Sequence, residues 1–201
     1  MKKTDYNVSM YAGNLYHVYN RGNGTEKIFF KDENYYYFLK QFKKYMGSLV
    51  DAFAYCLLPN HFHLLVKVKI NSPEIISESF RKFFISYSMS INKQECRKGS
   101  LLQRGFKRKL IEDERYFYAA IYYIHANAVH HGMVRDIKDY RYSSYNDLTL
   151  VKDDISSRDV IFEPRIKEEI FNWFGGKEQF ISYHEGLKKP GVMDNFIIEE
   201  V

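Results

Sequence analysis

Apolar and polar residues alternate from position 61 to 70, which is the most regular pattern in the chain. Because successive side chains of a strand point to opposite faces, one face here is purely apolar. The other face carries His61, His63, Lys67 and Lys69, with one leucine between them. The pattern predicts a half-buried strand that presents two imidazoles on its solvent-facing side. Two imidazoles at this spacing suit a divalent metal, and the lysines suit phosphate.

Strand-like and helix-like segments follow one another over the first 133 residues. Strands are predicted at 15–21, 50–58, 61–70 and 101–111 (clearest over 106–111), and helices are predicted over 32–46, from Ser72 onward and over 113–133. The order β-α-β-β-α-β is that of the split βαβ, ferredoxin-like arrangement, followed by one more helix. We therefore expect an α+β protein whose antiparallel sheet has helices on one face. The face that holds the histidines is expected to be open.

The last quarter of the chain has a different pattern. Residues 135–160 have the composition of a loop with a short helix, and 164–187 predict two short helices around Gly175-Gly176. With 201 residues, the chain fits one domain and an appendage. We place the domain at 1–150 and a C-terminal helical appendage and tail at 151–201.

Composition sets limits on the class of protein. A hydrophobic fraction of 45% is ample for a core, and the chain has no run of 18 apolar residues that would predict a membrane span. The N-terminus lacks the apolar stretch of a signal peptide, and two cysteines do not make a disulfide framework. We therefore expect a cytoplasmic protein. The net charge of +5 is weak evidence for nucleic acid, but the basic residues concentrate between positions 80 and 110.

A second group of candidate residues lies on the helix predicted from Asp113. Tyr123 and Asn127 are four residues apart, so their side chains are neighbours on one stripe of this helix. Tyr122, the main competitor, lies on the opposite flank with His125. A phenol and an amide oxygen placed together can act on one metal-bound phosphate.

These motifs resemble those of the single-tyrosine HUH transposases, the family of small insertion-sequence transposases and REP-associated tyrosine transposases. The histidine motif is His61-Phe62-His63 within residues 58–63, and the tyrosine motif spans 123–129 and continues at 132–134. Further similarity at 16–22, 106–107 and 142–145 extends the resemblance over residues 14–146, in the family's order. The segment after residue 150 and the asparagine in the tyrosine motif favour the REP-associated branch.

The resemblance implies a role for each matching position. His61, His63 and Asn127 would bind Mg²⁺ or Mn²⁺, and Tyr123 would be the nucleophile that cleaves and rejoins single-stranded or hairpin DNA through a 5′-phosphotyrosine. Residues 1–150 would then be the HUH single-tyrosine transposase domain. The chain departs from the family pattern at Ala128, where proline is usual. This departure removes no functional group.

Several basic residues are candidate DNA contacts, although a solvated face is the ordinary interpretation of any one of them. The candidates are Arg21, Lys67, Lys69, Arg104, Lys107 and Arg108. His17 shares a face with Arg21, and the sequence leaves open whether it meets DNA or lies in the core. His130 and His131 are interpreted as capping residues at the end of a helix, where positive charge is favourable.

Two other functions fit the same residues. One is a domesticated protein that binds DNA hairpins without cleaving them. The other is an unrelated metal-dependent hydrolase that uses the histidine pair to activate water and forms no covalent adduct. Transposases of this kind work as monomers or homodimers, and the sequence does not choose between these states.

Overall fold

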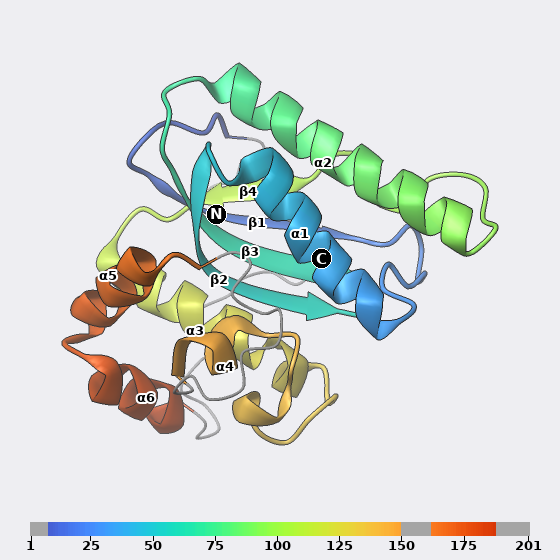
Figure 1. Cartoon of the computed structure of the whole chain (residues 1–201). Coiled ribbons are helices and arrows are strands. Elements are labelled where there is room, and N and C mark those ends of the chain that lie inside the picture. Colours follow the sequence, from blue (N-terminus) through green and yellow to red (C-terminus); the bar gives the residue numbers. More distant parts are fainter. Residues whose placement is uncertain (1–7, 150–161, 188–201) are drawn as a thin grey trace, which may run out of the picture.

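The computed structural model describes residues 8–149 and 162–187. Four strands and six α-helices follow the predicted order (Figure 1). The elements are β1 (Leu15–Arg21), α1 (Asp32–Met46), β2 (Val50–Leu58), β3 (His61–Val68), α2 (Pro73–Gln94), β4 (Lys107–Leu110), α3 (Glu114–His130), a 3₁₀ turn (Ile137–Asp139), α4 (Ser144–Thr149), α5 (Pro164–Phe174) and α6 (Lys177–Gly186).

The four strands form one sheet in the order β2-β3-β1-β4, and every neighbouring pair is antiparallel. This order follows from two crossovers, each of which places a helix between strands that are not neighbours. It is the ferredoxin-like arrangement, so the predicted fold class is confirmed. The register pairs Arg21 of β1 with His61 of β3 and Tyr19 with His63. The predicted chemistry therefore gathers at one end of the two central strands.

The apolar face of β3 packs against α1 and α2. The Phe62 ring lies 4.9 Å from that of Phe38 on α1 and 5.4 Å from that of Phe84 on α2, measured between centroids. Phe38 and Phe62 are fully buried. Burial of one such ring stabilises the fold by roughly 2 kcal/mol, so the apolar half of the alternation fixes the side of β3 that faces these helices.

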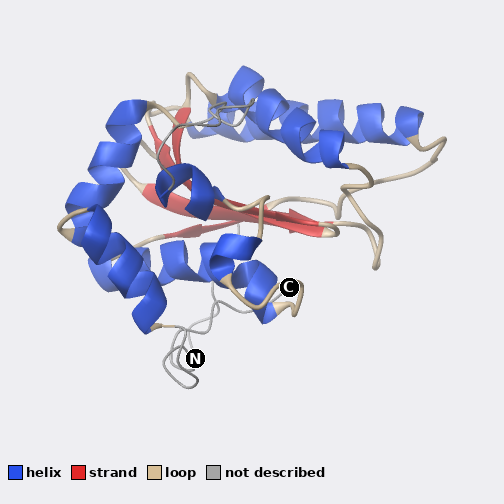
Figure 2. Cartoon of the chain, turned by 60° about the horizontal axis from the view of Figure 1, so that its bottom comes forward, coloured by secondary structure: helices blue, strands red, loops and turns tan. Residues whose placement is uncertain are grey.

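The other face of the sheet is not open, which corrects the expectation drawn from the sequence. Helix α3 packs against β2 and β3, and the sheet lies between two helical layers (Figures 1 and 2). His63 is consequently only 6% exposed. The sequence could not reveal this cover, because α3 lies on the far side of the sheet from both crossover helices.

The C-terminal helices hold α3 in place. The Trp173 ring of α5 lies 4.8 Å from that of Phe117 on α3, and the Tyr118 hydroxyl donates to the Trp173 carbonyl at 2.7 Å. On the sheet side, Arg165 donates to Asp51 at the start of β2 at 2.6 Å. The domain boundary predicted at residue 150 lies outside the described residues.

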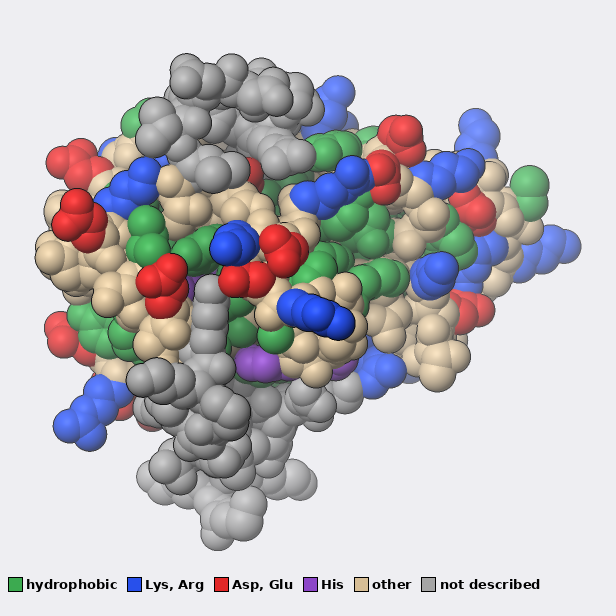
Figure 3. Space-filling model, turned by 90° about the horizontal axis from the view of Figure 1, so that it is seen from below, with side chains coloured by type: hydrophobic (Ala, Val, Ile, Leu, Met, Phe, Trp, Pro, Cys, Tyr) green, Lys and Arg blue, Asp and Glu red, His purple; other side chains and the backbone are tan. Residues whose placement is uncertain are grey.

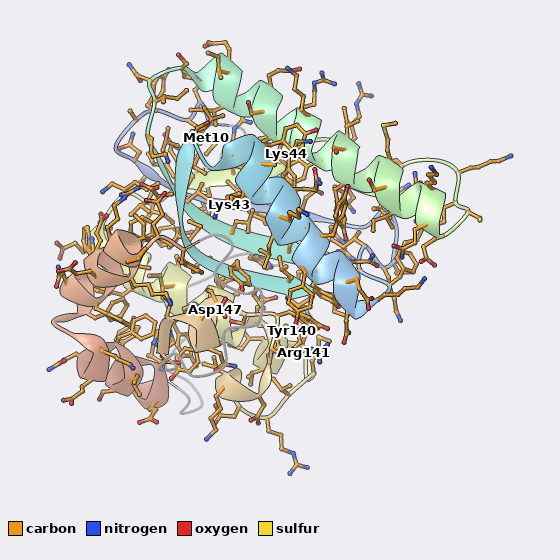
Figure 4. The ribbon with its side chains drawn as sticks, in the orientation of Figure 1. Met10, Lys43, Lys44, Tyr140, Arg141 and Asp147 are labelled. Atoms are coloured by element: carbon orange, nitrogen blue, oxygen red, sulfur yellow. The ribbon has the colours of Figure 1, made fainter. Side chains whose placement is uncertain are left out.

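The segment between α3 and α5 packs against β2. The Tyr140 hydroxyl donates to the carbonyl of Leu57 at 2.7 Å, and Tyr55 bonds Asp147 on α4 (Figure 4). Arg141 pairs with Asp32 at the start of α1. These bonds connect the segment that follows α3 both to β2 and to α1 on the other side of the sheet.

Element boundaries shift by a few residues from their predicted positions. β3 ends at Val68 rather than 70, β4 spans only four residues, and α3 ends at His130 rather than 133. Gly132 adopts a left-handed conformation just beyond α3, and the amide of Met133 returns to the carbonyl of Ala128 at 2.9 Å. No helix within residues 8–149 and 162–187 is long and apolar enough to cross a membrane.

Candidate active site

A cavity of about 270 Å³ opens where β1 and β3 meet the C-terminal half of α3. Its wall is formed by β1, β3, the β2–β3 turn and α3, the helix that carries Tyr123. The lining residues are Tyr19, Asn20, Arg21, Asn60, His61, Phe62, His63, Tyr123 and His131. Figure 3 views the molecule from the side of α3 and shows histidine side chains at the surface on this side.

His61 lies in this cavity with an oxygen on each side of its ring. Its Nδ1 lies 2.8 Å from Oδ1 of Asn60, and its Nε2 lies 3.0 Å from Oδ1 of Asn127. Burial lowers the pKa of His61 to about 4, the Asn127 bond opposes this shift, and His131 and Arg21 add to it. A neutral imidazole has one N–H, so it can donate to only one of the two oxygens.

His63 lies beside His61, with ring centroids 5.2 Å apart and planes nearly perpendicular. Its Nδ1 is 2.8 Å from Nε2 of His17, and burial keeps the pKa of His63 well below its usual value. Among the described residues, no group bonds its Nε2. His63 therefore offers one ring nitrogen to the cavity and uses the other to bond within the fold.

Tyr123 reaches the same cavity from α3. Its ring lies 5.5 Å from that of His63, edge to face, and 6.2 Å from that of His17. Tyr122 points elsewhere, since its hydroxyl donates to the carbonyl of Leu187 at 2.9 Å. The structure thus brings the predicted nucleophile and the histidine pair together within one chain.

Asn127 joins this group through its bond to His61. The side chain is fully buried, and its Nδ2 has no hydrogen-bond partner among the described residues. The helical period that placed Asn127 on the Tyr123 stripe therefore carries the amide to the histidine pair.

These donors fit a divalent cation. The Nε2 of His61 and the Oδ1 of Asn127 are 3.0 Å apart. Two neighbouring ligands of an octahedral ion have about this separation, since each lies about 2.1 Å from the ion at a right angle to the other. The single N–H of His61 cannot serve both asparagine oxygens. A cation held between His61 Nε2 and Asn127 Oδ1 would bind both of these atoms and leave the N–H at Nδ1 to donate to Asn60. Within residues 8–149 and 162–187, no group of three or more His, Cys, Asp or Glu side chains could hold a metal, so the set depends on the amide of Asn127.

Other lining residues were not identified from the sequence as parts of the site. His131 was interpreted as a helix cap, and it does follow the last residue of α3, but its ring lies 4.7 Å from that of His61. Helical periodicity could not place it, because it lies beyond the helix. Tyr19 stacks on His17 at 4.8 Å, and strand alternation does put these two side chains on one face. His17 itself, left open by the sequence, is 1% exposed beside His63.

The six predicted DNA-contacting residues occupy different places. Arg21 lines the cavity, and the amine of Lys107 lies 5.9 Å from the centre of the Tyr19 ring beside it. Lys67 and Lys69 lie toward the other end of β3, where they pair with Glu169 at 2.7 Å and with Asp51 at 3.4 Å. The structure does not bring these two lysines to the cavity.

The last two candidates lie in the loop before β4 and in β4 itself. Arg104 is exposed in the loop, whereas the guanidinium of Arg108 lies 5.0 Å from the centre of the Phe106 ring and donates to the carbonyl of Val8. Contact of any of these six residues with DNA stays a prediction.

Comparison with known proteins adds a relationship. No family model matches the chain. A REP-associated tyrosine transposase of Haemophilus influenzae is 31% identical over 104 residues, which are 48% of this chain and 59% of the relative. The match thus spans about three fifths of that protein's length.

A solved structure agrees with this relationship. A REP-associated tyrosine transposase bound to a REP hairpin superposes with a TM-score of 0.60 and 16% sequence identity, over 78% of this chain and 96% of that one. At this identity the likeness concerns the fold. The sequence match over 48% of the chain and the fold match over 78% of it agree, and the predicted resemblance to the REP-associated tyrosine transposases is confirmed.

Proposed function

We propose that this protein is a DNA strand transferase that cleaves and rejoins single-stranded or hairpin DNA through a tyrosine-linked intermediate. The observation that carries the proposal is the convergence of Tyr123, His61 and His63 on one cavity of about 270 Å³. The H. influenzae relative is described as a transposase, and the protein of similar fold binds a REP hairpin. Both support a DNA substrate for this chain.

Tyr123 would supply the attacking oxygen. Its phenolic oxygen forms a bond to the phosphorus of a phosphodiester, the bond from phosphorus to the 3′ oxygen breaks, and a 5′-phosphotyrosine results. The phenol loses one proton and the departing 3′ oxygen gains one, so protons balance. The covalent bond retains the energy of the phosphodiester, and a 3′-hydroxyl can reverse the step on the same or another strand.

His61, His63 and Asn127 would hold a divalent cation at this cavity. When bound, the cation would neutralise charge on the phosphate and orient it for in-line attack. Neutral imidazoles bind manganese more tightly than magnesium, whereas a phosphate substrate suits magnesium. Either ion agrees with two nitrogen donors and one amide oxygen.

The substrate must place one phosphate in a cavity whose rim is basic. Arg21 is in the lining, and Lys107 lies beside Tyr19 at its edge. Arginine and lysine at this position suit phosphate groups on either side of the scissile one. Because Tyr123 and the histidines come from one chain, a monomer has a complete site, and a homodimer would have two such sites. We expect the protein to act in the cytoplasm.

The test is a search for protein-linked DNA. End-labelled single-stranded oligonucleotides that contain hairpins are incubated with protein and Mn²⁺, and a denaturing gel separates adduct, cleaved DNA and intact DNA. We expect an adduct that Tyr123→Phe abolishes and EDTA prevents. Mass spectrometry should place the attached nucleotide on Tyr123.

Tyr122→Phe is the matched control, because Tyr122 is the neighbouring tyrosine and its hydroxyl faces away from the cavity. This variant should form the adduct as the wild type does. Shifted but uncut DNA would instead indicate a hairpin-binding protein, and cleavage without an adduct would indicate a hydrolase. Either result would overturn the proposal.

A further inference from the structure

A second hollow lies on the other side of the sheet, between α2 and the loop that leads into β4. Its volume is about 660 Å³. We call it the α2 groove. Its walls are residues of α2 and of 99–106, and Asn20 at the end of β1 belongs both to this groove and to the lining of the active-site cavity. The two hollows therefore adjoin at the end of β1.

The wall between the two hollows is firmly built. The Asn20 side chain donates to the carbonyl of Gln103 at 3.2 Å, and the amide of Gln103 donates to the carbonyl of Arg21 at 2.9 Å. Leu102 forms a bridge with Gly22 directly after β1. The loop before β4 is thus fixed to the strand that carries Arg21 into the cavity, so the groove keeps its position relative to the scissile phosphate.

The surface of the groove combines apolar side chains with positive charge. Ile85 and Met89 of α2 are 43% and 68% exposed, which is unusual for side chains of this kind. The half-buried Phe106 ring lies 5.4 Å from that of Phe84. The only charged residues in the lining are Arg81 and Arg104, and both are cationic.

We propose that the α2 groove binds the unpaired nucleotides that adjoin the scissile phosphate. This inference rests on the proposed function and extends its site by one subsite. Apolar and aromatic side chains offer faces on which bases lie, and Arg104 suits a phosphate between them, whereas Arg81 already pairs with Glu78 at 2.6 Å. The hydroxyls of Ser77 and Ser88 in the lining offer hydrogen bonds to base edges. The lining residue that the two hollows share, Asn20, places this surface next to the active-site cavity.

Introduction of a negative charge on α2 tests the proposal, with a matched control on the same helix. Met89→Glu puts a carboxylate into the groove, whereas Ile75→Glu does the same at an apolar position that is 53% exposed and outside the lining. Both sites are exposed, so neither variant should unfold the protein. Both are made in a Tyr123→Phe background, which keeps the DNA uncut.

Two fluorescent probes separate the groove from the rest of the DNA surface. One is a hairpin with randomised single-stranded flanks, and the other is the same hairpin with a blunt end. We expect Met89→Glu to weaken binding of the flanked hairpin about tenfold in anisotropy titrations, since loss of one base contact costs about 1–3 kcal/mol. Binding of the blunt hairpin should not change, and Ile75→Glu should affect neither probe.

Photo-crosslinking supplies a direct readout. A photoreactive base in the flank should crosslink to α2 or to residues 99–106. Equal weakening of both probes, no effect of Met89→Glu, or crosslinks confined to other surfaces would overturn the inference. If adduct formation by the wild type persists in any of these cases, the proposed function stands and only the groove assignment falls. Groove-dependent binding without an adduct would support the groove assignment and overturn the proposed function.

Discussion

Two buried histidine pairs lie on opposite flanks of α3, and they differ in what their nitrogens meet. His17 and His63 are joined on the side of the active-site cavity at 2.8 Å, and His125 and His184 are joined on the side of α6 at 2.9 Å. In each pair, burial lowers the pKa of a histidine well below its usual range. Burial and hydrogen bonding alone therefore do not separate a functional histidine from a structural one.

The pair near α6 has a partner for every nitrogen. His125 Nε2 lies 2.8 Å from the hydroxyl of Ser144, and His184 Nδ1 donates to the carbonyl of Phe180 at 2.8 Å. One neutral tautomer for each ring fits these bonds without leaving a donor unused. This arrangement joins α3, α4 and α6, which is a structural task.

The pair near the cavity is incompletely bonded. His17 Nδ1 is buried and has no partner in the described parts of the chain, and His63 Nε2 has only the cavity before it. Such unmet bonding capacity costs stability and is retained where a site needs it. The comparison indicates that an unbonded nitrogen, rather than burial, distinguishes the pair at the proposed site.

The largest effect is expected from removal of His63. His63→Ala should lower the rate of adduct formation at least about 100-fold, because a group aimed at the reacting phosphate is lost. The free energy of unfolding should fall as well, because the alanine leaves a void and removes the partner of His17 Nε2, so the adduct rate is measured per folded molecule. Adduct assays and urea titrations of the same preparation measure both quantities. An unchanged adduct rate would remove the basis for a functional role of this pair.

Removal of His184 should lower stability and leave adduct formation nearly unchanged. His184→Ala leaves a void and breaks the bonds to His125 and Phe180, so the free energy of unfolding should fall by about 2–3 kcal/mol. Adduct formation per folded molecule should stay within a few-fold of the wild type under conditions where the variant is folded. A specific loss of activity with full stability would show that α6 takes part in the chemistry and would break the comparison.

The smallest effect concerns pH and tests what the two pairs share. The pKa of His17 is lowered to about 3 by burial, with a contribution from Lys109, and that of His125 is also lowered by burial. Below pH 6.5 the unfolded chain binds protons that the folded chain does not, so stability falls as pH falls. Each such histidine contributes about 1.4 kcal/mol per pH unit. Urea titrations at pH 7, 6 and 5 give the slope of the free energy of unfolding against pH. We expect either His17→Phe or His125→Gln to reduce this slope by about 1.4 kcal/mol per pH unit, the contribution of one histidine.

Strand alternation and helical periodicity predicted much of the site. Alternation placed His61 and His63 on one face and Tyr19 on the face of His17, while the 3.6-residue period placed Tyr123 and Asn127 on one stripe, away from Tyr122. These are local properties, and local geometry preserves them whatever the rest of the chain does. The order of elements gave the sheet topology because the split βαβ pattern permits few strand orders.

Contacts between distant segments could not be predicted in this way. Lys67 alternates onto the face of the histidines but pairs with Glu169, which lies 102 residues later on a helix that covers this end of the sheet. His131 follows the end of α3, where no periodicity applies, and still lies against His61. The position of α5 decides the first outcome and that of α3 the second, and both result from packing that no single segment encodes.

The register of β1 against β3 has a consequence for the cell. His61 lies opposite Arg21 only in this register, and its partner Asn127 is supplied 66 residues later. A nascent chain that has left the ribosome as far as β3 already displays both imidazoles but lacks the helix that brings the attacking oxygen. Since a slip of one residue would turn the imidazoles to the opposite face, the proposed site is complete only in the finished fold.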